Sequence, residues 1–363
     1  MTEPDPTSLQ RTAETRIRLP DPRAMLDKLC AHFVEHGTVT LSDNGGRIEN
    51  QFGFAALELE PGALHVRAGG VDETALYVVK SAIADHLVMF ANDDVPSFTW
   101  SGEATASIPF FREMVVVGSR LVTPAMRRVT LRGDVAHFDN GQGLHVRVLI
   151  PPAGRVPVWP HAAPDGRTIW PRGEDALICR VYTIRAIDHE AGTLDIDVVL
   201  HEDSHAPGSD WAAGAMAGER VGLMGPGGGM LGPADWYLFA GDETALPAIA
   251  RMVESLPRDQ RAIAIIEVAD AGEQQPIASA PQVELIWLHR DGAAPGSTTL
   301  LEDAIRALSW PQGRGVVMVG CEHGAARAIR TLLRKERGMD KKDCQVAAYW
   351  RRGRSGDRVD EQE

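Results

Sequence analysis

The sequence predicts a multidomain α+β and α/β protein: a small α+β domain, then an antiparallel Greek-key β-barrel, then a parallel-sheet α/β domain. Three observations predict this order. At 363 residues the chain is longer than one hydrophobic core usually organises. Its middle part has short alternating strands with turn residues between them, and its last part alternates apolar strands with helices. We expect domains at 1–105, 106–234 and 235–353, followed by a polar tail at 354–363.

Composition and charge narrow the function classes. Hydrophobic residues make up 44% and charged residues 24% of the chain, which is typical of a soluble globular protein. The net charge of -13 argues against a nucleic-acid partner, because non-specific binding to phosphates needs a basic surface. No run reaches the roughly 18 to 20 apolar residues of a membrane span, and the polar N-terminus has no apolar secretory segment. We therefore expect a cytoplasmic protein with no membrane partner, with four cysteines that lack metal-ligand spacing and are interpreted as reduced thiols: Cys30, Cys179, Cys321 and Cys344.

The first domain is predicted to be a compact α+β unit without catalytic residues. Thr15–Leu19 is expected to be a strand, and Pro22–Glu35 a helix with an early proline. Several short strands follow, and Asp72 is placed to cap a second helix. Four histidines lie on different expected elements and are interpreted as surface or structural residues: His32, His36, His65 and His86.

The barrel is expected to end at about Pro233. Arg112–Leu121, Arg127–Leu131 and Gly143–Ile150 have the alternating pattern of strands that bury one face. A proline- and glycine-rich insertion, Pro151–Gly173, separates them from the next strand. Short strands with such turns and no long helix are typical of a closed antiparallel barrel.

One predicted barrel strand, Arg180–Arg185, carries the residue types that a flavin needs. Strand alternation puts Arg180 and Tyr182 on one face and Thr183 on the other. An aromatic ring can stack on a planar cofactor, an arginine can pair with phosphate and a hydroxyl can bond a ring edge. The alternative is a half-exposed strand that carries these residues by chance, so the motifs downstream decide.

The segment after the next strand contains a motif that resembles a zinc-binding site, and then the start of a helix. His201-Glu202-Asp203-Ser204-His205 matches the His-Glu-x-x-His pattern of zinc proteases, which works only on a helix. It follows a β-rich run and is cut short by Pro207, so we expect no metal site. Gly208–Ala213 is instead predicted to be a loop entering a short helix, with Ser209 near the N-cap. Such a helix start would bind a pyrophosphate, although an ordinary capped helix has the same pattern.

The last domain is predicted to be a parallel sheet covered on both faces. Ligands of such sheets bind beyond the carboxyl ends of the strands. The loops Gly241–Thr244 and Gly320–Gly324 lie there and are candidate contacts for a nicotinamide cofactor. The expected strands are Trp236–Ala240, Ile263–Val268, Val283–Leu288, Val316–Val319 and Val346–Tyr349. Three helices are expected: one that ends near Ser255, one at Leu300–Leu308 and one at Ala325–Arg337.

Taken together, these motifs resemble those of the siderophore-interacting proteins, which are FAD-dependent ferric-siderophore reductases with a ferredoxin-reductase-like fold. The resemblance covers about Phe111 to Gly353, and the first hundred residues resemble a small domain of unknown function that is sometimes fused ahead of this family. It rests on an ordered set of motifs: Arg180-x-Tyr182-Thr183, His201, Ser209-x-Trp211-Ala212, Gly241-Asp242-Glu243-Thr244-Ala245-Leu246-Pro247 and Tyr349-Trp350-Arg351-Arg352-Gly353.

The resemblance implies FAD in the barrel and NADPH or NADH as electron donor in the α/β domain. The flavin would carry the chemistry, so no catalytic side chain and no metal ligand is expected. Arg180 would pair with phosphate, Tyr182 would pack on the isoalloxazine and Thr183 would bond its edge. Apart from the resemblance, the C-terminal basic run is interpreted mainly as a solvated helix face and tail, and Arg327, near the start of its helix, is its first candidate for the 2′-phosphate of NADPH. Trp350 would cover a ring or anchor the interdomain seam. The other implied cofactor contacts are His201, Gly208, Ser209, Trp211, Asp242, Thr244, Ala245 and Glu322.

The implied partner is a ferric siderophore or another ferric chelate. Arg147, on a barrel strand, is the candidate for holding an anionic chelate. Where family members carry basic residues after the Gly-Pro turn and on the last strand, this chain has Gly228 and Gln345. A neutral chelate or a different ferric substrate therefore stays open. So do two other functions, a general NAD(P)H flavin reductase for another acceptor and a siderophore-binding protein without turnover.

Overall fold

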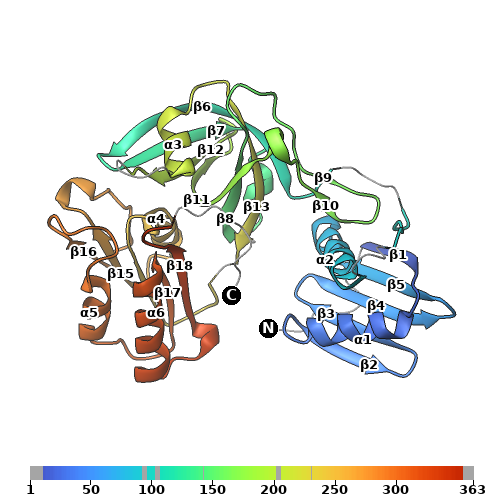
Figure 1. The fold of residues 1–363 in the computed structure, drawn as a ribbon. Coiled ribbons are helices and arrows are strands. Elements are labelled where there is room, and N and C mark those ends of the chain that lie inside the picture. The colour runs from blue at the N-terminus through green and yellow to red at the C-terminus, as the bar shows by residue number, and fades with distance from the viewer. Residues whose placement is uncertain are drawn as a thin grey trace. The chain divides into compact units, whose positions relative to one another are not determined.

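The computed structural model describes residues 11–91, 96–102, 107–141, 143–201, 206–229 and 231–354 (Figure 1). The chain divides into two compact units. One consists of Met1–Phe111 and Val158–Ala176, and the other of Arg112–Pro157 and Leu177–Glu363. The second unit contains both the barrel and the parallel sheet.

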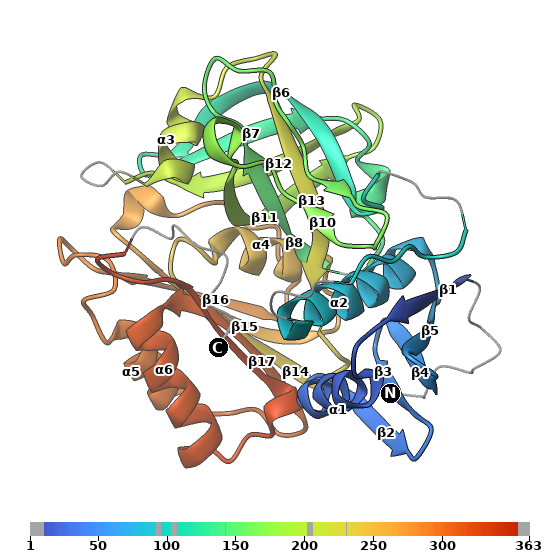
Figure 2. The same ribbon diagram turned by 45° about the vertical axis from the view of Figure 1, so that its right-hand side comes forward.

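The first unit is built on an antiparallel sheet with two helices on one face (Figure 2). The helices begin at aspartates: Asp21 accepts a hydrogen bond from Ala24 N (3.0 Å) and Asp72 one from Ala75 N (2.7 Å). The strands bury alternate residues against the helices, which confirms the predicted α+β domain. The elements are β1 (Arg11–Arg18), α1 (Pro22–Phe33), β2 (Thr38–Ser42), β3 (Gly45–Asn50), β4 (Gly53–Glu60), β5 (Ala63–Gly70) and α2 (Glu73–Ala91), in the sheet order β1-β5-β4-β3-β2.

Three of the four histidines within residues 11–91 of this unit lie together. The ring centroid of His32, near the end of α1, is 4.3 Å from that of His86 on α2 and 5.0 Å from that of His36. The sequence placed these residues on different elements and did not show that α1 and α2 pack side by side. Within the described ranges, no group of three or more His, Cys, Asp or Glu side chains is arranged to hold a metal ion.

Helix α2 is longer and more apolar than the sequence reading allowed. It has 19 residues and a mean hydropathy of 1.3, so by length and composition alone it could cross a membrane. It is not an uninterrupted apolar run of the kind that the sequence predicts to be absent, because Glu73, Lys80 and Asp85 lie within it. Its buried residues, among them Ile83 and Leu87, belong to the core of the first unit. Core helices of soluble proteins share this composition.

Most of the insertion after the third barrel strand, from Val158 onward, belongs to the first unit, although the sequence assigned all of it to the barrel domain. It contains the two-stranded hairpin β9 (His161–Ala162) and β10 (Thr168–Ile169). Trp100 Nε1 donates to Asp165 O at 2.8 Å, and Tyr77 Oη lies 2.8 Å from Thr168 Oγ1. These contacts join residues far apart in the sequence, so no local pattern predicts them.

The second unit begins with the predicted antiparallel barrel, which is confirmed as a closed six-stranded structure. Its interior is filled by inward-facing aliphatic residues such as Val129, Val148 and Ile196. A bulge interrupts β11 between Ile184 and Ala186. The elements are β6 (Phe111–Thr123), β7 (Met126–Arg132), β8 (Gly143–Ile150), β11 (Ile178–Asp188), β12 (Thr193–Val199), α3 (Pro207–Gly214) and β13 (Arg220–Gly228), in the closed order β11-β12-β7-β6-β13-β8.

The predicted parallel sheet is also confirmed, and it is covered on both faces. Leu238 of β14 packs into a core with α5 and α6, whereas its neighbour Phe239 packs into a second core with α4. The helix predicted at Ala325–Arg337 starts earlier, because the Glu322 carboxylate caps it. The elements are β14 (Trp236–Gly241), α4 (Leu246–Ser255), β15 (Arg261–Val268), β16 (Val283–His289), α5 (Leu300–Ala307), β17 (Gly315–Glu322), α6 (His323–Thr331) with a π-helical end at Leu332–Glu336, and β18 (Cys344–Trp350), in the sheet order β16-β15-β14-β17-β18.

Polar contacts join the barrel to the parallel-sheet domain inside the second unit. Arg185 of β11 forms a two-pronged ion pair with Glu254 of α4, with both N–O distances 2.7 Å. The buried Glu273 carboxylate accepts hydrogen bonds from Thr123 Oγ1 (2.5 Å) and Ala125 N (2.8 Å) at the β6–β7 turn. The two halves are therefore held in a defined arrangement by buried or half-buried polar groups.

Candidate functional site

A cradle of three predicted residues lies where β11 faces the start of α3. Arg180 and Tyr182 share one face of β11. A Cβ atom built on Gly208 would lie 1.9 Å from Tyr182 Oη and 3.4 Å from Arg180 Cγ. A larger residue than glycine therefore does not fit here without displacing the phenol. Residues that the sequence singled out separately are thus brought into contact.

The start of α3 differs in detail from the prediction. The helix begins at Pro207 with Ala206 as N-cap, so Ser209 is the third helical residue and does not cap it. Instead, Ser209 Oγ accepts a hydrogen bond from His201 N at 3.0 Å, which ties the segment after β12 to the helix. The first N–H groups of a helix have no acceptor within the helix, so this end attracts anions. Glu202–His205 lie outside the described residues.

The environment of β11 suits a phosphate and an aromatic ring. Burial raises the pKa of Tyr182 to about 12, against the opposing effect of Arg180, so the phenol stays protonated at neutral pH. Thr183 is buried on the opposite face, where its backbone pairs with that of His145. Trp211 packs against the barrel core. The cradle and the helix start thus supply the cation, the amides and the ring that a flavin dinucleotide requires.

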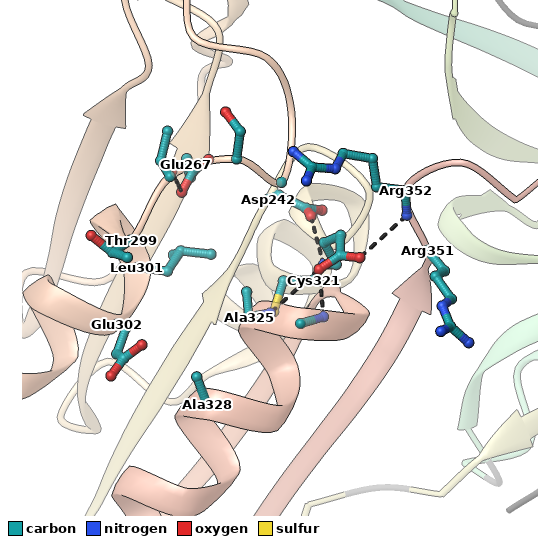
Figure 3. A pocket seen from close by; sticks show the side chains of 15 residues that line it. Asp242, Glu267, Thr299, Leu301, Glu302, Cys321, Ala325, Ala328, Arg351 and Arg352 are labelled. Carbon is teal, nitrogen blue, oxygen red and sulfur yellow. Dashed lines mark hydrogen bonds between the residues drawn. The ribbon is translucent and has the colours of Figure 1, made fainter.

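A second candidate site is a pocket of about 460 Å³ beyond the carboxyl ends of β14, β15 and β17 (Figure 3). Parallel sheets bind their ligands at this end. Two predicted residues, Asp242 and Glu322, line it. The other lining residues are Glu267, Gly296, Ser297, Thr298, Thr299, Leu301, Glu302, Cys321, Gly324, Ala325, Ala328, Arg351 and Arg352.

Asp242 is held by several hydrogen-bond donors at the floor of this pocket. Its Oδ1 accepts from Thr244 N (3.0 Å) and Thr244 Oγ1 (2.5 Å). Its Oδ2 accepts from Trp350 Nε1 (2.8 Å) and Glu322 N (3.1 Å). Burial raises the pKa of Asp242 to about 6, although the bonds from Thr244 and Trp350 favour the ionised form. Asp242 therefore organises the loops around the pocket.

The Glu322 carboxylate occupies the N-terminus of α6. One oxygen accepts from Gly324 N and Ala325 N, and the other accepts from Arg352 N at 3.2 Å. Desolvation opposes ionisation, but these backbone N–H groups prevail and lower the pKa of Glu322. The positive end of the α6 dipole is therefore already neutralised by a side chain.

The remaining predicted contacts of the parallel-sheet domain divide into two groups. Trp350 lies beside the pocket, with its indole bonded to Asp242 and its ring edge against Gly296, so its observed contacts are within this domain. Ala245 is fully buried between Gly241 and Gly320 and presents no side-chain surface. Arg327 is exposed on α6 and does not line the pocket.

Arg147 lies on the outer face of the barrel. Its neighbours along β8, Val146 and Val148, fill the barrel core, so alternation directs Arg147 outward. In the strand pairing, Arg147 lies opposite Val181 of β11 on one side and opposite Met224 of β13 on the other. Val181 is 61% exposed. Arg147 is thus a half-buried cation beside an exposed apolar side chain.

Sequence reasoning missed several residues at these sites. His145 Nε2 lies 3.0 Å from Tyr349 Oη, which links a barrel strand to the last strand of the sheet. Glu267 and Thr298 meet at the pocket, with Thr298 Oγ1 3.1 Å from each carboxylate oxygen. The only signal for Glu267 was its position next to the end of an apolar strand.

A closed barrel with a glycine-dependent cradle, joined to a parallel sheet with a pocket beyond its strand ends, has the two-part arrangement that the sequence predicts for an FAD-binding oxidoreductase. Family models match in the same order. A siderophore-interacting FAD-binding domain matches residues 115–230 and the siderophore-interacting protein model matches residues 234–353. A domain described as an uncharacterized protein conserved in bacteria matches residues 14–101.

Individual relatives support the same assignment. Ferric vibriobactin reductase ViuB from Vibrio cholerae is 34% identical over 246 residues, which cover 66% of this chain and 89% of ViuB. The crystal structure of a siderophore utilization protein from T. fusca is 40% identical, with a TM-score of 0.59 and coverage of 69% of this chain and 97% of that one. The siderophore-interacting protein SipS from Aeromonas hydrophila is 30% identical with a TM-score of 0.57, over 68% and 93% of the two chains. The chain belongs to the siderophore-interacting protein family.

Proposed function

We propose that this protein is an FAD-dependent reductase of ferric siderophores that takes its electrons from NADH or NADPH. The observation that carries the proposal is the cradle of Arg180, Tyr182 and Gly208 in a chain related to a ferric vibriobactin reductase. The pocket beyond the parallel strands supports a nicotinamide donor.

When bound, FAD supplies the conversion of a two-electron hydride into the single electrons that Fe(III) accepts. Arg180 and the first N–H groups of α3 would hold the phosphates. Tyr182 would pack on the ring system, and Gly208 would let the backbone approach closely. Thr183 would bond the ring edge, and His201 would line the remainder of the cofactor. The chain then needs no acid, base or iron ligand of its own.

The iron-loaded chelate is the substrate in this proposal. Hard oxygen ligands hold Fe(II) more weakly than Fe(III), so reduction loosens the metal and releases it in the cytosol. Arg147, beside the exposed Val181, would hold an anionic chelate by charge and apolar contact. Arg147→Ala is expected to raise KM for an anionic ferric chelate and to spare a neutral acceptor. Equal effects on both acceptors would remove Arg147 from the substrate site.

The function is tested with purified full-length protein. We expect a yellow protein whose flavin absorption is bleached anaerobically by NADH or NADPH and restored by a ferric chelate, with ferrous iron caught by a trap. Arg180→Ala and Tyr182→Ala are each expected to weaken flavin retention. A colourless protein that binds no flavin contradicts the proposal. Turnover with many acceptors but none with ferric chelates identifies a general flavin reductase instead.

A further inference from the structure

The pocket beyond the parallel strands has two sides of opposite charge (Figure 3). Glu267 at the end of β15 and Glu302 on α5 lie on one side, and Arg351 and Arg352, which follow β18, lie on the other. These two acids have partners of their own: Glu302 pairs with Arg306 of α5 at 2.9 Å, and Arg290 lies 3.5 Å from Glu267. Other charged groups around the pocket are also paired. The α6 N-terminus is capped by Glu322, and the buried Arg290 is bonded to Glu243.

The paired groups leave few cations for a ligand. Within the part of the chain that the structure describes, the Arg351 and Arg352 side chains are the guanidinium groups that line the pocket. Their two positive charges can neutralise the two phosphates that join the halves of a nicotinamide dinucleotide. A further phosphate on the ribose would require another cation, and the opposite side of the pocket offers carboxylates.

Glu267 is the carboxylate best placed to meet the ribose. It is only 4% exposed, yet it lines the pocket. Thr298 Oγ1 lies 3.1 Å from both of its oxygens and Arg290 Nη1 lies 3.5 Å from one, so its orientation is fixed. A fixed carboxylate at the end of the second strand accepts a hydrogen bond from a ribose hydroxyl and repels a phosphate in the same place.

We propose that the pocket selects NADH over NADPH, and that Glu267 is the residue that determines this specificity. Glu302, on the same side of the pocket, adds to the repulsion of a 2′-phosphate. Arg327, which the sequence suggested for that phosphate, is exposed on α6 and is not one of the lining residues, although its neighbour Ala328 is. This inference rests on the proposed function, because it assumes that a nicotinamide dinucleotide is the donor.

The test measures binding of ADP-ribose and 2′-phospho-ADP-ribose to the FAD-loaded full chain by calorimetry, and anaerobic flavin reduction by NADH and NADPH. Burial raises the pKa of Glu267, so the measurements are made at about pH 8 to keep its carboxylate ionised. We expect ADP-ribose to bind at least about tenfold more tightly than its phosphorylated form, with the same order in the reduction rates. In Glu267→Gln the ratio should fall several-fold, mainly through tighter binding of the phosphorylated ligand.

Two further variants complete the test. Glu302→Gln should also lower the preference for ADP-ribose over its phosphorylated form, and it replaces Glu267→Gln as the test if that variant does not fold. Glu284→Gln, an exposed acid on β16 outside the pocket lining, should keep the parent ratio. Equal affinities, a preference for the phosphorylated ligand, or parent ratios in both pocket variants would overturn the proposal.

Failure of this inference can be told apart from failure of the proposed function. If neither nucleotide binds but chemically reduced protein still reduces a ferric chelate, the donor assignment is wrong and the reductase function stands. If the protein retains no flavin, the reductase function fails, and ADP-ribose binding still tests the pocket by itself.

Discussion

At the scale of single residues, Gly208 is the position where the proposed cofactor site depends most directly on side-chain size. Tyr182 Oη occupies the space that any Cβ at Gly208 would need. Alanine favours helices over glycine by up to about 1 kcal/mol, so Gly208→Ala should not harm α3 as a helix. Any loss of FAD affinity in this variant therefore reflects a change in the cradle and not in the helix.

We predict that Gly208→Ala weakens FAD binding at least about tenfold, because it pushes the Tyr182 ring out of place. Flavin fluorescence quenching measures the dissociation constant. The matched control is Gly214→Ala at the other end of the same helix, where an added Cβ meets no atom within 4 Å. Tyr182→Phe in the Gly208→Ala background should recover part of the affinity, since it removes the clashing hydroxyl. Parent affinity in Gly208→Ala would contradict the cradle.

Asp242 gives a second prediction at this scale. Because burial raises its pKa to about 6, the folded protein is stabilised by the protonated form, and this contribution is lost as the pH rises from the ordinary aspartate range through 6. The Trp350 indole N–H bonded to Asp242 should report the event. We expect its NMR resonance to titrate with a midpoint near 6 and to stop titrating in Asp242→Asn. A shift that is flat between the acidic and neutral ranges would show that the donors keep Asp242 ionised throughout.

At the scale of elements, the packing of α1 against α2 brings three imidazoles together and makes His32 resist protonation. Desolvation, then the neighbouring His86 and His36, lower the pKa of His32, while Glu35 acts in the opposite direction. Lys28 also faces this end of α2, where it donates to Phe90 O, and Asp85 precedes His86. A histidine whose folded pKa is lowered favours the unfolded chain once acid protonates it.

We therefore predict that His32 lowers the melting temperature of the full chain as the pH falls from about 7.5 to about 5.5, while protonation of Asp242 raises it over part of the same range. His32→Gln should flatten this dependence. His65→Gln is the control, because His65 lies on β5 beside Glu14 and Glu58 and outside the group. Identical pH profiles for the parent and His32→Gln would show that the group does not govern acid stability.

Helices and strands were predictable where the sequence pattern that specifies them is local. The alternation along β6, β7 and β8 predicted the barrel, and the apolar runs of β14 and β15 predicted the parallel sheet, because burial on one or both faces imposes a regular pattern of apolar residues. Contacts between distant segments impose no such pattern. Neither the attachment of the insertion to Trp100 nor the meeting of His32 with His86 has a sequence period.

The candidate sites follow the same rule. Arg180, Tyr182 and Gly208 were found because their spacing within motifs resembles a known order. Their mutual contact, and the role of Glu322 as a helix cap, became evident only with the fold. Glu267 was missed because a lone acid at a strand end is common, and its meaning depends on Thr298 and on the arginines across the pocket.

At the scale of the whole molecule, the barrel and the parallel sheet must keep a fixed arrangement if electrons are to pass between ligands bound on each. Glu273 makes the most enclosed of the polar contacts between them described above, since its side chain is buried and bonds both Thr123 Oγ1 and Ala125 N. Removal of this carboxylate leaves the buried Thr123 hydroxyl and the half-buried Ala125 N–H without this acceptor, and an unsatisfied buried group costs about 1–3 kcal/mol.

We predict that Glu273→Ala lowers the free energy of unfolding by about 2 kcal/mol or more in a urea titration. Glu273→Gln should lie between this variant and the parent, because its amide oxygen can accept from Ala125 N and its NH₂ can donate to Thr123 Oγ1, which keeps both contacts but loses the charge. Glu284→Ala, an exposed acid of the same domain, should lie within about 0.5 kcal/mol of the parent. Flavin reduction by the nicotinamide donor should slow in Glu273→Ala more than FAD affinity falls, since the cradle lies wholly on the barrel side. Unchanged stability would mean that the two halves are held together by their apolar contacts alone.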